Sequence, residues 1–131
     1  MTKPQPSLDQ WLAEAKLSPN ADKCGMFLVH NGVVRTTPKA QVREGVEGLG
    51  EVAQIEFSYD AEGLDAAINE ALSWEGVYYV RVWMNEGALN VGDSIMYVLV
   101  GADIRPHCID ALQRLVGKIK SELVVEKEIM A

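Results

Sequence analysis

Lysine side chains near the C-terminus are the first candidates for chemistry in this sequence. Lys120 falls at the border of the apolar stripe of a predicted helix that begins at Pro106. A lysine there can leave a packed surface and place its ammonium group in an adjoining cleft, although the helix dipole alone also favours a lysine near a helix C-terminus. Lys127 follows a short apolar run between Glu126 and Glu128, so it is either a second functional cation or an exposed lysine paired with its acidic neighbours.

Two arginines stand at junctions between predicted elements. Arg35 closes an apolar run and opens a long polar segment, and Arg105 directly precedes the helix that begins at Pro106. A guanidinium group at such a junction can hold a carboxylate or a phosphate through paired hydrogen bonds, helped by helix N–H groups. Both can equally be solvated arginines at strand ends. No nucleophile–base triad or glycine-rich phosphate loop competes with these four cations.

The charge pattern favours a small anionic ligand. The net charge of −7 argues against broad nucleic-acid binding, which needs a basic face. From Arg105 onward, however, basic residues gather in the chain, and a locally basic pocket on an acidic protein suits a small anion. No apolar run approaches the roughly 20 residues that cross a bilayer, and Met1–Pro6 lacks the apolar stretch of a secretory signal. We therefore expect a cytoplasmic protein that binds neither nucleic acid nor membrane.

The cysteines and histidines give little support to metal or thiol chemistry. Cys24 and Cys108 lie far apart in the sequence and are expected to be reduced thiols, with a disulfide or a catalytic thiol as the alternatives. The only histidines are His30 and His107. A histidine-rich metal site is therefore not expected, and no cofactor is predicted.

Hydrophobic periodicity predicts one α+β domain over residues 1–131. Amphipathic spacing predicts helices over 7–17, over 60–73 and from Pro106 to about Lys120. Alternating or β-rich runs predict strands, and the segment 35–50 is expected to be a mobile loop. This order favours a two-layer sandwich, with helices on one face of a mixed, mostly antiparallel sheet. The predicted strands are 25–34 (interrupted at 30–32), 53–59, 77–84, 95–100 and 123–125.

The order of these segments resembles the catalytic, large subunits of molybdopterin synthase. The run from His30 to Arg35 is similar to the place where a strand of that family ends in Gly-x-Val-Arg. The run from Trp83 to Asp93 is similar to the family's His-Arg-x-Gly-x-Leu-x-x-Gly-Asp/Glu turn. An apolar strand, Arg105, a long helix ending at Lys120, and then Lys127 follow in the family's order. The resemblance spans roughly Gly25 to Glu128.

The resemblance implies a fold, a reaction and a partner. It implies an α/β-hammerhead-like fold and an enzyme that converts cyclic pyranopterin monophosphate to molybdopterin. The sulfur would come from a thiocarboxylate on the C-terminal Gly-Gly of a small ubiquitin-like subunit, and the large subunit would be a homodimer within a heterotetramer. By position, Lys120 and Lys127 would hold the tail and assist sulfur transfer, while Arg35 and Arg105 would bind the substrate phosphate or stabilise developing charge.

Departures from the family pattern leave two other interpretations of the function open. Ile104 stands where the family has a histidine, and Val124-Val125-Glu126 precedes the second lysine where the family has Pro-Ile-Trp. One alternative is a catalytically impaired relative that serves as a dimeric binding or regulatory module for a Gly-Gly-tailed partner. The other is an unrelated α+β protein. Four aromatic residues are expected near one helix–strand junction, either in the core or in a dimer contact: Trp74, Tyr78, Tyr79 and Trp83.

Overall fold

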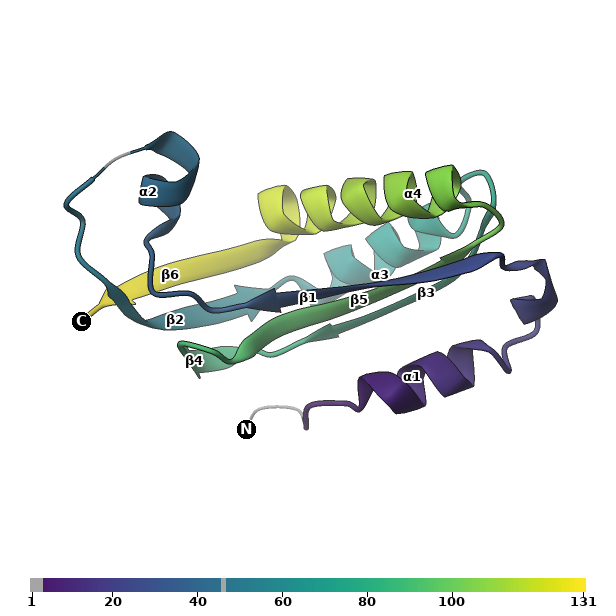
Figure 1. Ribbon diagram of the computed structural model, residues 1–131, viewed down its shortest axis with the longest axis horizontal. Coiled ribbons are helices and arrows are strands. Elements are labelled where there is room, and N and C mark those ends of the chain that lie inside the picture. Colours follow the sequence, from purple (N-terminus) through teal and green to yellow (C-terminus); the bar gives the residue numbers. More distant parts are fainter. Residues whose placement is uncertain (1–3, 46) are drawn as a thin grey trace.

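Helices and strands alternate along the chain largely where the hydrophobic periods place them. The computed structural model describes residues 4–45 and 47–131 (Figure 1). The α+β class predicted from the sequence is confirmed. The elements are α1 (Leu8–Ala15), the 3₁₀ turn η1 (Ala21–Lys23), β1 (Met26–Val33), α2 (Lys39–Glu44), β2 (Val52–Tyr59), α3 (Ala61–Ala71), β3 (Val77–Met84), β4 (Gly87–Asn90), β5 (Ser94–Ala102), α4 (Arg105–Lys118), the π-helical turn η2 (Ile119–Leu123) and β6 (Val124–Met130).

Strand pairing differs from the single mixed sheet that the sequence predicted. Within residues 4–45 and 47–131, the strands form two three-stranded sheets, in the orders β1-β5-β3 and β4-β2-β6. Every pairing in them is antiparallel. The central strand of the first sheet, β5, is buried along all nine residues, because strands flank both its edges and helices cover both its faces. The second sheet lies toward the end of the molecule that carries α2 (Figure 1).

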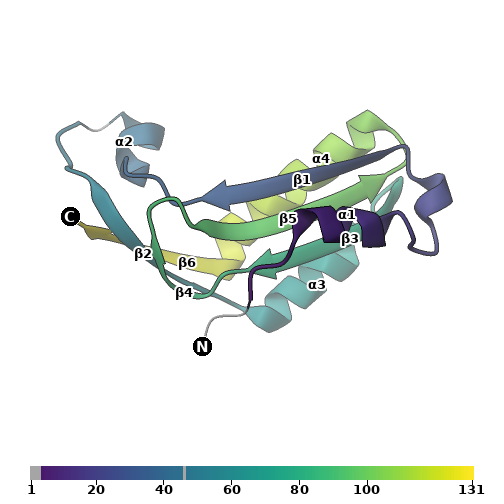
Figure 2. The same cartoon turned by 60° about the horizontal axis from the view of Figure 1, so that its bottom comes forward.

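The two faces of β5 belong to two different packing clusters, because successive strand side chains point to opposite sides. Val98 and Val100 pack in the large core that includes Leu115 of α4 and residues of α3. Tyr97 packs in a smaller cluster with Trp11 of α1. Figure 2 shows α1 on the side of the first sheet opposite α4. The predicted two-layer arrangement therefore describes α3 and α4, whereas α1 adds a third layer.

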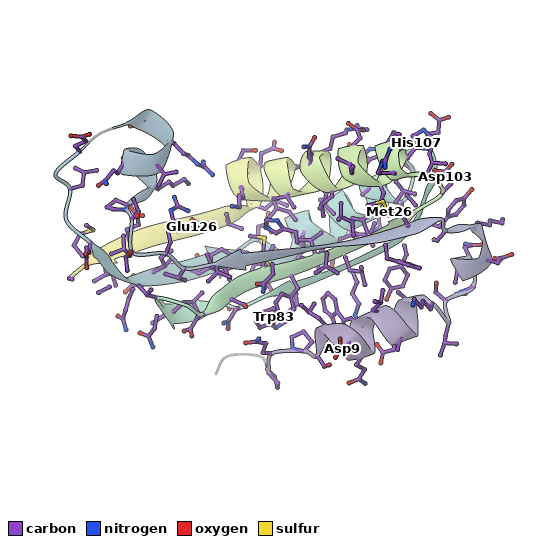
Figure 3. The ribbon with its side chains drawn as sticks, in the orientation of Figure 1. Asp9, Met26, Trp83, Asp103, His107 and Glu126 are labelled. Atoms are coloured by element: carbon purple, nitrogen blue, oxygen red, sulfur yellow. The ribbon has the colours of Figure 1, made fainter. Side chains whose placement is uncertain are left out.

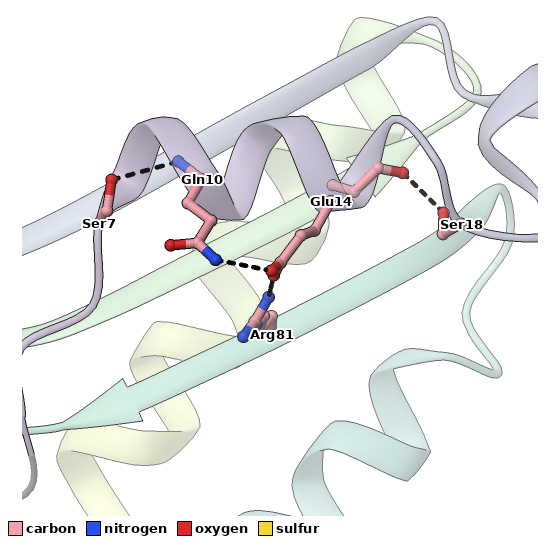
Figure 4. Close-up of polar contacts among 6 residues, drawn as sticks. Ser7, Gln10, Glu14, Ser18 and Arg81 are labelled. Carbon is pink, nitrogen blue, oxygen red and sulfur yellow. Dashed lines mark hydrogen bonds and ion pairs between the residues drawn. The ribbon is translucent and has the colours of Figure 1, made fainter.

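Polar contacts and ring packing fix α1 on its side of the sheet (Figure 4). The Ser7 hydroxyl accepts a hydrogen bond from the Gln10 N–H at 3.2 Å and caps the helix, a contact typically worth about 1 kcal/mol. Glu14 forms an ion pair with Arg81 of β3 and accepts a hydrogen bond from the Gln10 side chain. The ring of Trp11 meets that of Tyr97 edge-on, with centroids 6.0 Å apart.

Several local predictions were wrong because strand partners cannot be seen in a local pattern. The tripeptide 30–32 does not interrupt β1, since its residues pair with residues 96–98 of β5. Residues 87–90, predicted as part of a turn region, form β4 against β2. The predicted loop 35–50 contains the helix α2. The C-terminal strand β6 runs to Met130, well past the predicted end at Val125, because β2 pairs with it along most of its length.

The aromatic residues predicted near one helix–strand junction divide between both faces of the first sheet. Tyr79 and Trp83 pack in the cluster with α1. Trp74 packs against the main core, and the Arg114 guanidinium lies 3.9 Å from its ring centroid. Packing within the chain therefore accounts for these three rings, whereas Tyr78 has the Lys23 ammonium group 5.7 Å from its ring centroid and belongs to neither cluster. A dimer contact at this place stays a prediction.

Candidate active site

A cleft beside α2 collects charged side chains from distant parts of the chain. The cavity itself is small, about 50 Å³, and it opens to solvent. Part of its lining is uncharged, and we call this part the floor: Gly32, Val33, Ile55, Ile95 and Met96. Four cations and two carboxylates complete the lining and give it a formal charge of +2: Arg35, Lys39, Arg43, Lys120, Glu126 and Glu128. Figure 3 shows Glu126 on β6 at the end of the molecule that carries α2.

Arg35 reaches the cleft because the residue before it is fixed against the turn between β4 and β5. The Val34 N–H donates to the Asp93 carbonyl at 3.0 Å, and the Val34 carbonyl accepts from the Gly92 N–H at 2.9 Å. The Val34 side chain is buried in the core. These contacts hold the backbone at the end of β1, so the exposed Arg35 side chain leaves the chain beside the cleft.

Lys120 enters the cleft from the π-helical turn η2. Ile119, directly before it, is completely buried and anchors this turn in the core. Lys120 itself is half-buried, and no acidic group of the described residues forms an ion pair with it. The neighbouring Lys118 differs, because its ammonium group pairs with Glu70 at 2.8 Å on the outer side of α4. π-Helical turns recur at functional sites, and this one leaves Lys120 as the cation that η2 presents to the cleft.

The helix α2 supplies two cleft cations that the sequence reasoning missed. Lys39 and Arg43 stand four residues apart, so they share one face of α2 and both line the cleft. The Lys39 N–H donates to Glu128 Oε2 of β6 at 2.8 Å, which ties the first turn of α2 to the cleft wall. The signal was a lysine and an arginine at helical spacing directly after Pro38, a residue typical of helix starts. The polar composition of 35–50 concealed it.

Lys127 does not line this cleft. Side chains alternate along β6, so Glu126 and Glu128 face the cleft and Lys127 faces the other way. Lys127 is exposed and stands opposite Glu56 of β2, in a shallow depression on the outer side of the second sheet. The expectation that Lys120 and Lys127 share one cavity is therefore wrong for the single chain.

Arg105 lies far from the cleft as well. It begins α4, whereas Lys120 follows the end of that helix. A rise of about 1.5 Å per residue over α4 separates the two positions by roughly 20 Å. Figure 3 shows Asp103 and His107, which flank Arg105 in sequence, at the opposite end of the molecule from Glu126. The cleft of one chain thus brings together Arg35 and Lys120 of the predicted site and leaves out Arg105 and Lys127.

His30 borders the floor of the cleft. It precedes Gly32 by two residues on β1, so the two residues share a face of the strand. Burial lowers the pKa of His30, and the positive charge of Lys120 lowers it further. The imidazole is therefore predominantly neutral near pH 7. It lies next to a cleft that is lined by four cations.

Metal ligation and membrane insertion find no support in the described part of the chain. Among residues 4–45 and 47–131, no three histidine, cysteine, aspartate or glutamate side chains gather as a metal site would require. Cys24 and Cys108 are both free thiols, as expected. No helix there has the length and apolar character needed to cross a bilayer.

Solved structures of molybdopterin synthase subunits share this fold. Molybdopterin synthase from Staphylococcus aureus aligns with a TM-score of 0.73 at 17% identity, covering 96% of this chain and 86% of that one. Molybdopterin cofactor biosynthesis protein E from Burkholderia multivorans aligns with a TM-score of 0.72 at 21% identity, covering 98% and 84%. A complex of subunits 1 and 2 of molybdopterin-converting factor from Helicobacter pylori aligns with a TM-score of 0.64 at 15% identity, covering 95% and 80%.

The sequence was compared with curated proteins and with models of protein families. No curated protein matches the chain. The family described as MoaE protein matches residues 2–122, which include Arg35, the whole of α4 and Lys120, but not Lys127. Since the match extends over most of the sequence, the chain belongs to the MoaE family, the large subunits of molybdopterin synthase, which act in molybdenum cofactor biosynthesis.

Proposed function

We propose that the cleft receives the C-terminal thiocarboxylate of a small Gly-Gly-tailed subunit and the phosphate-bearing pterin to which its sulfur is transferred. The observation that carries this proposal is the convergence of four cations from three separate segments on one cleft with a formal charge of +2. A thiocarboxylate and a phosphate monoester are both anions, and fixed cations bind anions without reorganising at the moment of reaction.

Lys120 and Arg35 are the residues that we assign to the reacting end of the tail. Lys120 is half-buried beside the apolar floor, and its ammonium group has no acidic ion-pair partner among the described residues. It is thus available to hold the thiocarboxylate or to supply a proton as sulfur leaves the tail. Arg35 can hold an anion through paired hydrogen bonds. Lys39 and Arg43, on α2 across the cleft, are placed to bind the substrate phosphate.

Lys127 and Arg105 keep only conditional roles in this proposal. Each lies away from the cleft of its own chain. They contribute to catalysis only if a second copy of the chain or a bound partner brings them to it. The predicted homodimer supplies such a second copy. If sites are shared between copies, Lys120→Ala and Arg105→Ala should each lower turnover, and mixing the two variants should restore part of it.

A small subunit is the partner that the comparisons favour. The Helicobacter pylori relative was solved as a complex of subunits 1 and 2 of molybdopterin-converting factor. We propose an equivalent partner for this chain, with the Gly-Gly tail entering the cleft and a homodimer of this chain at the centre of a heterotetramer. The free thiols of Cys24 and Cys108 are in keeping with a cytoplasmic location, where thiols stay reduced.

The test is a sulfur-transfer assay with two neighbouring lysines compared. The purified chain, a thiocarboxylated small subunit and cyclic pyranopterin monophosphate are mixed, and molybdopterin is measured. Lys120→Ala should lower turnover by about 10- to 100-fold, the effect of removing one electrostatic contact to the reacting group. Lys118→Ala is the matched control and should keep turnover, since Lys118 pairs with Glu70 outside the cleft.

Two outcomes would contradict the proposal in different ways. Full turnover by Lys120→Ala would remove Lys120 from the mechanism. Tight binding of the small subunit without any molybdopterin formation by the unmodified chain would identify a binding module rather than an enzyme.

A further inference from the structure

One buried polar atom beside the cleft has no hydrogen-bond partner. The Nε2 atom of His30 is inaccessible to water, and no other described residue donates to it or accepts from it. Buried side-chain nitrogen atoms are mostly paired, and leaving one unpaired costs about 1–3 kcal/mol. Retaining an unpaired imidazole nitrogen at this place therefore calls for a physical explanation.

Gly32 places this nitrogen next to the space that a ligand would occupy. A Cβ atom built on Gly32 would lie 3.4 Å from His30 Nε2 and 3.6 Å from the Met96 side chain. Gly32 and Met96 both belong to the floor. Because glycine has no side chain, nothing from residue 32 fills the gap between the imidazole edge and the floor. His30 Nε2 is thus within a short side-chain movement of the cleft.

Charged groups approach this region from several elements. Lys120 comes from η2, Arg35 from the end of β1, Lys39 and Arg43 from α2, and Glu126 and Glu128 from β6. The positive charge of Lys120 opposes protonation of the His30 ring. The facing residue of β5, Val98, is apolar. Burial is the larger cause of the lowered pKa of His30 and the charge of Lys120 is the smaller one, so an anion that neutralised Lys120 would remove the second of the two.

We propose that His30 is a conditional fifth cation of the cleft: neutral while the cleft is empty, and protonated with Nε2–H directed at the ligand when a doubly charged anion binds beside Lys120. This rests on the proposed function of the cleft as an anion site and adds a residue that binds the ligand together with a proton. In this proposal Nε2 has no partner in the empty cleft because its hydrogen-bond acceptor is the bound ligand. Sulfate and phosphate monoesters are the class of ligand that fits, since two negative charges offset both Lys120 and the imidazolium.

Inorganic sulfate is the probe, because it does not titrate where histidine does, between about pH 5.5 and 8. The chain has only two histidines, so NMR titration of the imidazole carbons can follow both, with single variants for assignment. The pKa of His30 should lie below 6.5 without sulfate and rise by about one unit at saturation. The pKa of His107, which a hydrogen bond with Asp103 already raises at the far end of α4, should not respond to sulfate.

Affinity gives a second, independent measurement. A rise of about one pKa unit makes sulfate binding about tenfold stronger at low pH than at high pH. His30→Gln should lose this dependence, whereas His107→Gln should retain it. Gly32→Ala should reduce the dependence, because its methyl group would stand 3.4 Å from Nε2 and would hinder movement of the ring toward the cleft.

The outcomes separate this inference from the proposed function. An unchanged His30 pKa in a sulfate-saturated protein would overturn the inference alone and leave the anion site intact. An absence of sulfate binding at every pH would overturn both. A normal pH dependence in His30→Gln would assign the bound proton to another group and would also overturn the inference.

Discussion

Glu128 has two separable effects on the cleft, and two substitutions can distinguish them. Its carboxylate lowers the positive charge of the lining and also accepts the Lys39 N–H at 2.8 Å. Glu128→Gln removes the charge and keeps a carbonyl acceptor for that N–H. Glu128→Ala removes both. A comparison of the two variants therefore isolates the anchoring of α2 from the electrostatics of the cleft.

The magnitudes of the two effects can be estimated. At an assumed separation of roughly 8 Å, a carboxylate repels a doubly charged anion by about 1 kcal/mol in a water-like medium and about 4 kcal/mol at an effective dielectric constant of 20. For an open, salt-screened cleft we expect about 0.5–1 kcal/mol, or two- to fivefold tighter sulfate binding in Glu128→Gln. A hydrogen bond to a charged group contributes about 1.5–3 kcal/mol, and partial exposure reduces the Lys39 contact to about 1 kcal/mol.

Amide hydrogen exchange and sulfate titration measure these two effects. In Glu128→Ala, amides of residues 39–44 should exchange about fivefold faster, the equivalent of about 1 kcal/mol of lost local stability. In Glu128→Gln they should stay within about twofold of the unmodified chain, and sulfate should bind more tightly than in Glu128→Ala. Equal exchange rates in the two variants would refute the anchoring role of Glu128. Weaker sulfate binding by Glu128→Gln would refute the electrostatic reasoning.

Two further predictions concern the other end of the molecule. Gly76→Ala should lower the free energy of unfolding, measured in urea, by more than about 2 kcal/mol, because φ is +77° and the new Cβ would stand 2.2 Å from Asp103 Oδ1. Gly45→Ala is the control: φ is +69° there too, but the space around it is open, so the loss should be only about 1 kcal/mol. The hydrogen bond with Asp103 raises the pKa of His107 above 6.5, so its stabilisation is complete below pH 6.5 and is lost as pH rises through the raised pKa. His107→Gln should therefore destabilise the chain more at pH 5.5 than at pH 9, and equal losses at both would contradict this linkage.

The elements that the sequence predicted well are those whose side-chain pattern has one dominant period. The i, i+3, i+4 stripe of α3 and the alternation of β2 fall within a residue or two of their observed bounds. Ser7 and Asp60, the first residues of two predicted helices, cap α1 and α3 by accepting backbone N–H groups. These features depend on neighbours close in sequence, which a single chain displays fully.

The missed features depend on partners distant in sequence. Without β2 beside it, the charged run 126–128 gave no sign of a strand, and so the alternation that turns Lys127 away from the cleft went unseen. The helix α2 is short and polar, and its tie to Glu128 spans 89 positions of the chain. Arg35 and Lys120 were found because their positions at the ends of predicted elements were right, even though their neighbours in the cleft were not.

The order of strands within the sheets has a consequence for synthesis on the ribosome. Both β1 and β3 pair with β5, and β2 pairs along most of its length with β6. While the chain emerges, β1 therefore waits for residues 94–102 before it has any neighbour, and the longest partner of β2 is the last strand to be made. Such late closure exposes unpaired strand edges to other nascent chains. We expect in-cell yield to depend on translation rate and on chaperone capacity more than for a protein of equal length built from sequential hairpins.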